Sequence, residues 1–275
     1  MTEKTTNTEI GATASHPYKK LSIQVSLNGL SFCIIDTIGN TIERSETIPF
    51  KSASTPYLVL KELKAQFETH KVADGQYASV SVIHCNDFYC LVPRALFQKE
   101  ELPNYLKFNT KLLASDEIVF DELPNCEMNC VYVPFTNINN YLFDLFGPFD
   151  FSHQSTNLIQ LLLKQKPSNK AVCYVHIANR SMSLAVIEQK KVLLYNQFEF
   201  GSKEDLLYYV LFTYEQLQLD PETIKLRLFG AVEDGDEHFS ICHEYIKKVA
   251  VFMPHEGLTD MGIDPERSID LTLLG

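Results

Sequence analysis

One pattern of strands occurs twice in this chain, and it limits the folds that the chain can adopt. Residues 30–52 (LSFCIIDTIGNTIERSETIPFKS) align without a gap with residues 180–202 (RSMSLAVIEQKKVLLYNQFEFGS), so that Ile42 meets Val192. Each copy contains two strands of a predicted three-strand meander, and each is followed by apolar residues at helical spacing and then by a further strand. The repetition predicts an α/β protein of two similar lobes that arose by internal duplication.

The order of predicted elements divides the chain into three parts. Residues 1–17 are rich in Thr, Ser and Asn and lack apolar periodicity, so we expect a disordered tail. The first lobe, with a helix that links the lobes, is expected at 18–168 and the second lobe at 169–275. Asn28-Gly29 between the first two strands is typical of a tight hairpin in which both residues have positive φ. Strands are expected at 21–27, 30–36, 41–50, 77–84, 88–93, 117–123, 129–134 and 223–230, with the second meander at 172–200. Helices are expected at 56–70, in 94–108 at least up to Pro103, and at 135–147, 152–166, 203–219 and 237–249.

Charge and cysteine content restrict the partners and the compartment. A formal net charge of -11 argues against nucleic acid and anionic membrane surfaces as partners. No window approaches the ~20 apolar residues of a membrane span, and the N-terminus has no apolar stretch that would serve as a signal peptide. Seven cysteines, an odd number, fit free thiols in a reducing compartment, and none has zinc-site spacing. We therefore expect a cytoplasmic protein without a transmembrane segment or a metal.

Two lobes that each open with three meandering strands, a helix and a further strand resemble the actin, sugar-kinase and heat-shock-70 ATPase superfamily, whose lobes are ribonuclease-H-like. Within that superfamily, the chain is most similar to the bacterial branch that includes FtsA and PilM. The chain also resembles an uncharacterised Bacteroidota family of unknown function, which implies no activity. The resemblance implies a two-lobed actin-like fold.

The resemblance also indicates where a nucleotide site would lie. In the superfamily each hairpin turn presents an Asp, which holds Mg²⁺ through water, and small residues that let backbone N–H groups approach phosphate. These Asp positions fall on Ser26 in IQVSLNGLSF and on His176 in YVHIANRSM, and the glycine after the second one is Ala178. The adenosine-binding turn, normally Gly-Gly, is LRLFGAV and retains only Gly230. All three motifs depart from the pattern, which predicts that Mg-ATP hydrolysis is lost.

The turns at Asn28-Gly29 and Arg180-Ser181 could still form a weak anion cradle, with Arg180 as a phosphate ligand. The resemblance thus implies a relic nucleotide site without a catalytic residue, a metal or a cofactor. Its positions are Ser26, Asn28, Gly29, His176, Ala178, Arg180, Ser181 and Gly230. A simpler interpretation of His176 is a hydrogen bond to its neighbours at a strand end, and of Arg180 an exposed, solvated side chain.

The leading hypothesis is a catalytically silent actin-like protein that works as a scaffold or assembly component with a protein partner. The alternative is an ATP-binding or ATP-hydrolysing enzyme of the same superfamily that uses a displaced acid such as Asp36 or Glu188. A third possibility is an accidental repeat in some other α/β fold, in which case the meanders at 22–50 and 172–200 would not superpose. A fold-level resemblance cannot identify a substrate.

Overall fold

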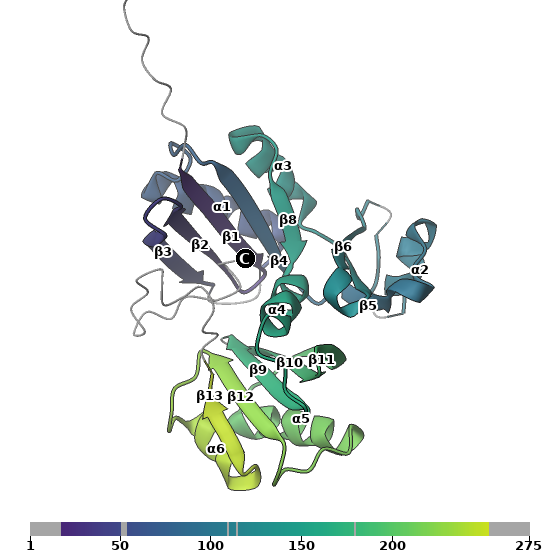
Figure 1. Ribbon diagram of the computed structural model, residues 1–275. Helices are drawn as coiled ribbons and strands as arrows, with labels where there is room; N and C mark the ends of the chain where they lie inside the picture. Colours follow the sequence, from purple (N-terminus) through teal and green to yellow (C-terminus); the bar gives the residue numbers. More distant parts are fainter. Residues whose placement is uncertain (1–17, 51–53, 109, 114, 179, 253–275) are drawn as a thin grey trace, which may run out of the picture.

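The computed structural model describes residues 18–50, 54–108, 110–113, 115–178 and 180–252. The predicted tail at 1–17 and the chain from residue 253 onward lie outside the described residues. The described chain forms two lobes and a smaller third unit, and helix α4 (Gln154–Leu163) lies where they meet (Figure 1). None of the helices in these ranges is both long and apolar enough to cross a membrane.

The first lobe is built on a five-stranded sheet with the order β3-β2-β1-β4-β8. Its first three strands form an antiparallel meander, and β4 and β8 add to it in parallel. The strands are β1 (Lys19–Ser26), β2 (Gly29–Asp36), β3 (Thr41–Pro49), β4 (Ser79–Cys85) and β8 (Asp150–His153), and the helices of this lobe are α1 (Pro56–His70) and α3 (Thr136–Phe146).

The second lobe repeats this order in a sheet arranged β11-β10-β9-β12-β13. Its meander is again antiparallel, and β12 and β13 again add in parallel. The elements are β9 (Val172–Ala178), β10 (Ser181–Glu188), β11 (Lys191–Glu199), α5 (Lys203–Gln216), β12 (Lys225–Gly230), α6 (Glu237–Tyr245) and β13 (Lys248–Val251). The predicted two-lobed α/β fold is confirmed, whereas its origin by duplication stays a prediction.

The helix after each meander starts at a side-chain cap and covers one face of its sheet. Thr55 accepts a hydrogen bond from the backbone of Leu58 at the start of α1, and Ser202 and Asp205 form a capping box at α5. Alternate residues of β1 pack against α1, and alternate residues of β9 pack against α5. The intervening residues of both strands therefore point to the opposite face of each sheet.

The two meanders do not match at the constant offset of the sequence alignment. The loop between β2 and β3 has four residues (37–40), and the loop between β10 and β11 has two (189–190). The gapless alignment is therefore right for the third strand of each meander and shifted by two residues for the first two. A shift of two keeps each side chain on the same face of the sheet, which is why the apolar phases still agreed.

The turn between β1 and β2 also differs from the prediction. It consists of Leu27 and Asn28, and neither Asn28 nor Gly29 has a positive φ. Gly29 is the first residue of β2, and a Cβ there would lie 2.9 Å from the carbonyl oxygen of Ile48. The glycine thus permits the close approach of β3 and is not required by the conformation of the turn.

The third unit is an antiparallel sheet with the order β5-β7-β6, inserted between β4 and α3. Burial raises the pKa of Asp121, whose carboxylate joins this unit to the segment before α4. It accepts hydrogen bonds from the Tyr132 hydroxyl (3.0 Å), the His153 backbone (2.8 Å) and the Thr156 hydroxyl (2.7 Å). The elements are β5 (Tyr89–Pro93), α2 (Leu102–Leu106), β6 (Val119–Leu123), β7 (Met128–Tyr132) and the short 3₁₀ turns Arg94–Leu96, Lys99–Glu101 and Pro124–Cys126.

Two histidines lie side by side in the centre of the molecule. His84 at the end of β4 pairs with His153 at the end of β8, and both side chains are fully buried. Each ring accepts a backbone N–H at Nδ1 and has an oxygen partner at Nε2, which requires the neutral ring with its proton on Nε2. The Nδ1 partners are Phe135 (3.2 Å) for His84 and Ser155 (3.2 Å) for His153, and the Nε2 partners are Asn139 Oδ1 (3.1 Å) and Asn86 O (2.9 Å).

Burial lowers the pKa of both histidines. The pKa of His84 falls to about 3 through burial and then the neighbouring His153, and the hydrogen bond to Asn139 opposes the shift only in part. Burial lowers the pKa of His153 to about 4. Both rings are therefore neutral at physiological pH.

Candidate functional site: the cavity between the lobes

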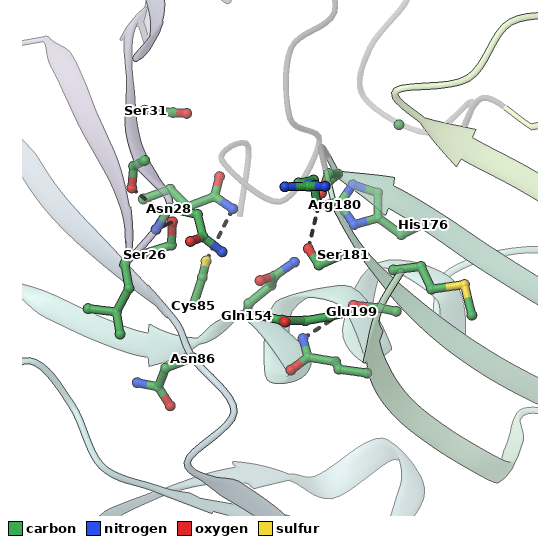
Figure 2. A pocket seen from close by; sticks show the side chains of 18 of the residues that line it. Ser26, Asn28, Ser31, Cys85, Asn86, Gln154, His176, Arg180, Ser181 and Glu199 are labelled. Carbon is green, nitrogen blue, oxygen red and sulfur yellow. Dashed lines mark hydrogen bonds between the residues drawn. The ribbon is translucent and has the colours of Figure 1, made fainter. Parts of the chain in front are cut away.

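A cavity of about 390 Å³ lies between the two lobes. The turn between β1 and β2 lies on one side and the turn between β9 and β10 on the other (Figure 2). The segment after β4 and the first residue of α4 close it from the interior, and Gly230 with Ala231 lines it at the end of β12. Both meanders therefore contribute their first turn to one shared space.

The structure brings all eight predicted site positions to this cavity. Ser26, Asn28 and Gly29 come from the first lobe, and His176, Arg180 and Gly230 are among those from the second. Ala178 and Ser181 complete the set. Their joint position follows from the topology, because parallel β1 and β4, and likewise β9 and β12, end at the same edge of their sheets. The role of these positions as a relic nucleotide site stays a prediction.

The pairing of strands changes one of the predicted equivalences. Gln24 lies opposite Ser31 in the first meander, and His176 lies opposite Ser183 in the second. Gln24 and His176 therefore occupy the same place in their lobes, whereas Ser26 corresponds to Ala178. The predicted pair of Ser26 and His176 is therefore offset by two residues in the structure, and which of the two marks the Asp position of the resemblance stays a prediction.

The hydroxyl groups of both turns hydrogen-bond within the turns themselves. Ser26 Oγ donates to the carbonyl of Gly29 (2.9 Å) and accepts the backbone N–H of Asn28 (3.1 Å). In the second turn, Ser181 Oγ donates to the carbonyl of Ala178 (3.0 Å). The Asn28 N–H is thus already used inside the turn, which weakens the anion cradle expected there.

Gly230 allows β12 to pack closely against β9 at the cavity wall. Its φ of +91° is in the left-handed region, and a Cβ at this position would lie 2.2 Å from the Ile177 carbonyl oxygen and 2.8 Å from His176 Cδ2. The His176 ring is 2% exposed, and its centroid is 5.0 Å from that of Phe229. The packing of β12 against β9 therefore explains this glycine without a nucleotide.

The charged groups of the cavity lie at its rim. Arg180 and Glu199 come from the second lobe, and Asp87 follows β4 in the first; all three side chains are exposed. Partial burial of its carboxyl group raises the pKa of Asp87, and the negative charge of Glu199 raises it further. Among the described residues, no group of three His, Cys, Asp or Glu side chains is arranged to hold a metal ion.

Several lining residues were missed in the sequence. Gln24 and Gln154 are buried and uncharged, and Asp87 and Glu199 lie outside the motifs that the resemblance supplies. Gln154 directly follows a predicted helix cap, and nothing local marks it as a cavity residue. Gln24 would have been found from the phase of β1, since it alternates with Ile23 and Val25, which face α1.

Comparison with protein families gives one match that spans most of the chain. A family model described as "Protein of unknown function (DUF3822)" matches residues 9–249. No curated protein matches the sequence.

Comparison with solved structures indicates the fold. A Bacteroides thetaiotaomicron protein with actin-like ATPase fold and unknown function is 20% identical, with a TM-score of 0.76 over 91% of this chain and 98% of that chain. The PilM-PilN type IV pilus biogenesis complex matches with 12% identity and a TM-score of 0.59 over 92% of this chain and 93% of that one. The cytoplasmic domain of EpsL, an inner membrane component of the type II secretion system of Vibrio cholerae, matches with 13% identity and a TM-score of 0.50, covering 88% and 93% of the two chains.

Proposed function

Because this chain belongs to the DUF3822 family of proteins of unknown function and has the actin-like ATPase fold, we propose that it is a catalytically silent member of that fold. Its role in this proposal is that of a scaffold or assembly component that binds another protein in the cytoplasm. The observation that carries the proposal is that the equivalent positions near the ends of β1 and β9, where the resemblance implies carboxylates, hold Gln24 and His176.

Neither side chain suits Mg²⁺ with a triphosphate. Mg²⁺ is a hard cation that prefers charged oxygen ligands, usually through water. The Gln24 amide oxygen has no charge, and an imidazole nitrogen such as that of His176 is a poor ligand for this ion. The replacements occur in both lobes, so the cavity lacks a carboxylate at each of the places where this fold would direct one toward the metal.

The acids named in the enzymatic alternative lie away from the cavity. Asp36 is at the far end of β2 from Gly29, and its carboxylate accepts the backbone N–H groups of Ile38 (2.7 Å) and Gly39 (2.9 Å) in a turn. Glu188 is likewise at the far end of β10 from Ser181. An enzymatic mechanism would instead have to use Asp87 and Glu199 at the rim.

The assembly role rests on weaker support, from the relatives. PilM is named as part of a complex with PilN, and EpsL as a component of a secretion system. At these identities the likeness shows the fold alone. The proposal therefore states only that the partner is a protein. The cytoplasmic location is proposed from the odd number of cysteines in the sequence, which fits thiols in a reducing compartment better than a disulfide framework.

Mg-ATP should not bind to the purified protein. We expect isothermal titration calorimetry with ATP and Mg²⁺ to give no heat of binding beyond dilution, because both carboxylate positions are replaced. The same titration with EDTA in place of Mg²⁺ serves as the control for metal dependence. A Mg²⁺-dependent dissociation constant of about 1 µM would contradict the proposal of a silent site.

The assembly role predicts a stable protein complex in the native organism. Affinity-tagged protein at its natural expression level should co-purify with one defined protein in near-stoichiometric amount, and the purified pair should re-form when the two are mixed. An untagged strain gives the background. If the tagged protein elutes alone at the size of its own chain under gentle, low-salt extraction, the scaffold proposal fails, whatever the result with ATP.

A further inference from the structure

Primary amides and hydroxyl groups share most of the polar lining of the interlobe cavity. Among the described residues, five primary amide side chains border it: Gln24, Asn28, Asn86, Gln154 and Gln197. Two of them serve the fold, since Asn86 donates to the carbonyl of Val133 (2.9 Å) and Gln197 donates to the hydroxyl of Ser183 (3.2 Å). A primary amide offers a donor and an acceptor on the same carbon atom, so it can bind two neighbouring hydroxyl groups of a ligand at once.

Gln24 carries a buried acceptor that has no donor. Its side chain is 9% exposed and Nε2 donates to Cys85 Sγ (3.2 Å), but Oε1 is without a hydrogen-bond partner among the described residues. A buried polar atom left in this state costs about 1–3 kcal/mol. A ligand that brings an N–H or O–H group to Gln24 Oε1 would recover that free energy, which makes this atom a specific recognition point.

Gln154 provides a second recognition point from another element. It is the first residue of α4 and is 8% exposed, and Figure 2 shows its side chain extending toward Ser181 between the two turns. Within the described chain, the hydrogen bonds leave the side-chain amides of Gln154 and Asn28 unused. Three amides from three elements can therefore contact one molecule in the cavity.

The charge at the rim selects against anions. Among the described lining residues, Asp87 and Glu199 place two carboxylates there against one guanidinium, that of Arg180. A triphosphate or a sugar phosphate would meet this excess of negative charge, whereas a neutral molecule would not. The wall also includes Phe88, whose exposed aromatic face suits the C–H face of a saturated ring.

We propose that the interlobe cavity binds a small, uncharged, polyhydroxylated ligand, a monosaccharide or a cyclic polyol, through the amides of Gln24, Gln154 and Asn28. The volume of about 390 Å³ lies in the range of small-molecule sites. The proposed ligand does not depend on the assembly role, because its binding can be measured on the purified chain without a protein partner.

The test is a titration of the full chain with named neutral probes: glucose, N-acetylglucosamine, ribose and myo-inositol. We expect at least one of them to bind with a dissociation constant below about 1 mM in calorimetry. The variants Gln24→Leu and Gln154→Leu should each weaken binding at least tenfold, since each removes a hydrogen-bonding amide from the wall. Gln160→Leu, on the same helix but outside the cavity, is the matched control and should bind as the unmodified protein does.

Three results would overturn the proposal. They are the failure of all four probes to bind, affinity that is unchanged in both cavity variants, and tighter binding of glucose 6-phosphate than of glucose, which would mean that the site prefers an anion. Gln24→Leu removes an acceptor without a partner, so its thermal midpoint should not fall. If that variant does not fold, Gln154→Leu decides between the outcomes.

Discussion

Gly230→Ala is expected to lower the free energy of unfolding by more than about 3 kcal/mol. The new methyl group would lie 2.2 Å from the Ile177 carbonyl oxygen, which belongs to the backbone and cannot rotate away. The left-handed φ of +91° adds a cost of about 1–2 kcal/mol for any residue with a Cβ. Relief would require the end of β12 to separate from β9 in the middle of the sheet. Equilibrium unfolding in urea measures the change.

Gly235→Ala is the matched control for this substitution. Gly235 has a similar φ of +84°, but a Cβ there would have no atom within 4 Å. Its loss of stability should therefore be limited to the conformational cost of about 1–2 kcal/mol. Equal losses in the two variants would show that packing against His176 and Ile177 is not what requires Gly230.

Acidification from pH 7 to pH 5 is expected to lower the free energy of unfolding by up to roughly 4 kcal/mol. In the folded protein the pKa values of His84 and His153 lie at about 3 and about 4, below their ordinary value of 6.5. Below pH 6.5 the unfolded chain therefore binds two protons that the folded chain does not, and each costs up to about 1.4 kcal/mol per pH unit. The contribution is complete above pH 6.5 and is lost as the pH falls toward the folded values.

Two carboxyl groups act in the opposite direction. Burial raises the pKa of Asp87 and Asp121, so the folded protein takes up their protons first and gains stability as the pH falls. The histidines dominate because both are fully buried and their Nδ1 atoms accept backbone N–H groups, which a protonated ring cannot do. Urea unfolding at several pH values between 7 and 5 gives the net slope.

Single substitutions of the two histidines test whether they cause the dependence of the unfolding free energy on pH. His153→Asn keeps an acceptor at the cap of α4, and His84→Asn keeps one near the Phe135 backbone; each should reduce the pH slope by about half even if it lowers stability at every pH. The difference between slopes is insensitive to a constant loss of packing. Slopes equal to that of the unmodified protein in both variants would show that other groups cause the acid sensitivity.

The meanders and their helices could be predicted because local rules and tertiary packing agree in them. In β1, Leu21, Ile23 and Val25 alternate with polar residues, and this alternation alone assigns one face to α1. The caps at Thr55 and Ser202 are marked just as clearly. The two-lobed fold therefore follows from patterns that extend over fewer than about 20 residues each.

The third unit and the interlobe cavity could not be predicted from such local patterns. Residues 94–106 contain helix-forming side chains, yet the structure has only two 3₁₀ turns and the five-residue α2 there, because Pro103 and the packing of Tyr105 interrupt a longer helix. The cavity depends on how elements of both lobes and α4 meet, and the equivalence of Gln24 and His176 follows from strand pairing. The sequence paired Ser26 with His176 because the gapless alignment did not allow for the two-residue difference in length between the loop after β2 and the loop after β10.

The two turns that face each other across the cavity belong to different lobes, so any rotation of one lobe against the other would change the distance between them. A molecule that touches Gln24 on one side and Gln154 or the second turn on the other would bind best at one particular angle between the lobes. Ligand binding in the cavity would then be coupled to the shape of the outer surface. A protein partner that recognises that surface would change the affinity for the ligand by the same factor as the ligand changes the affinity for the partner.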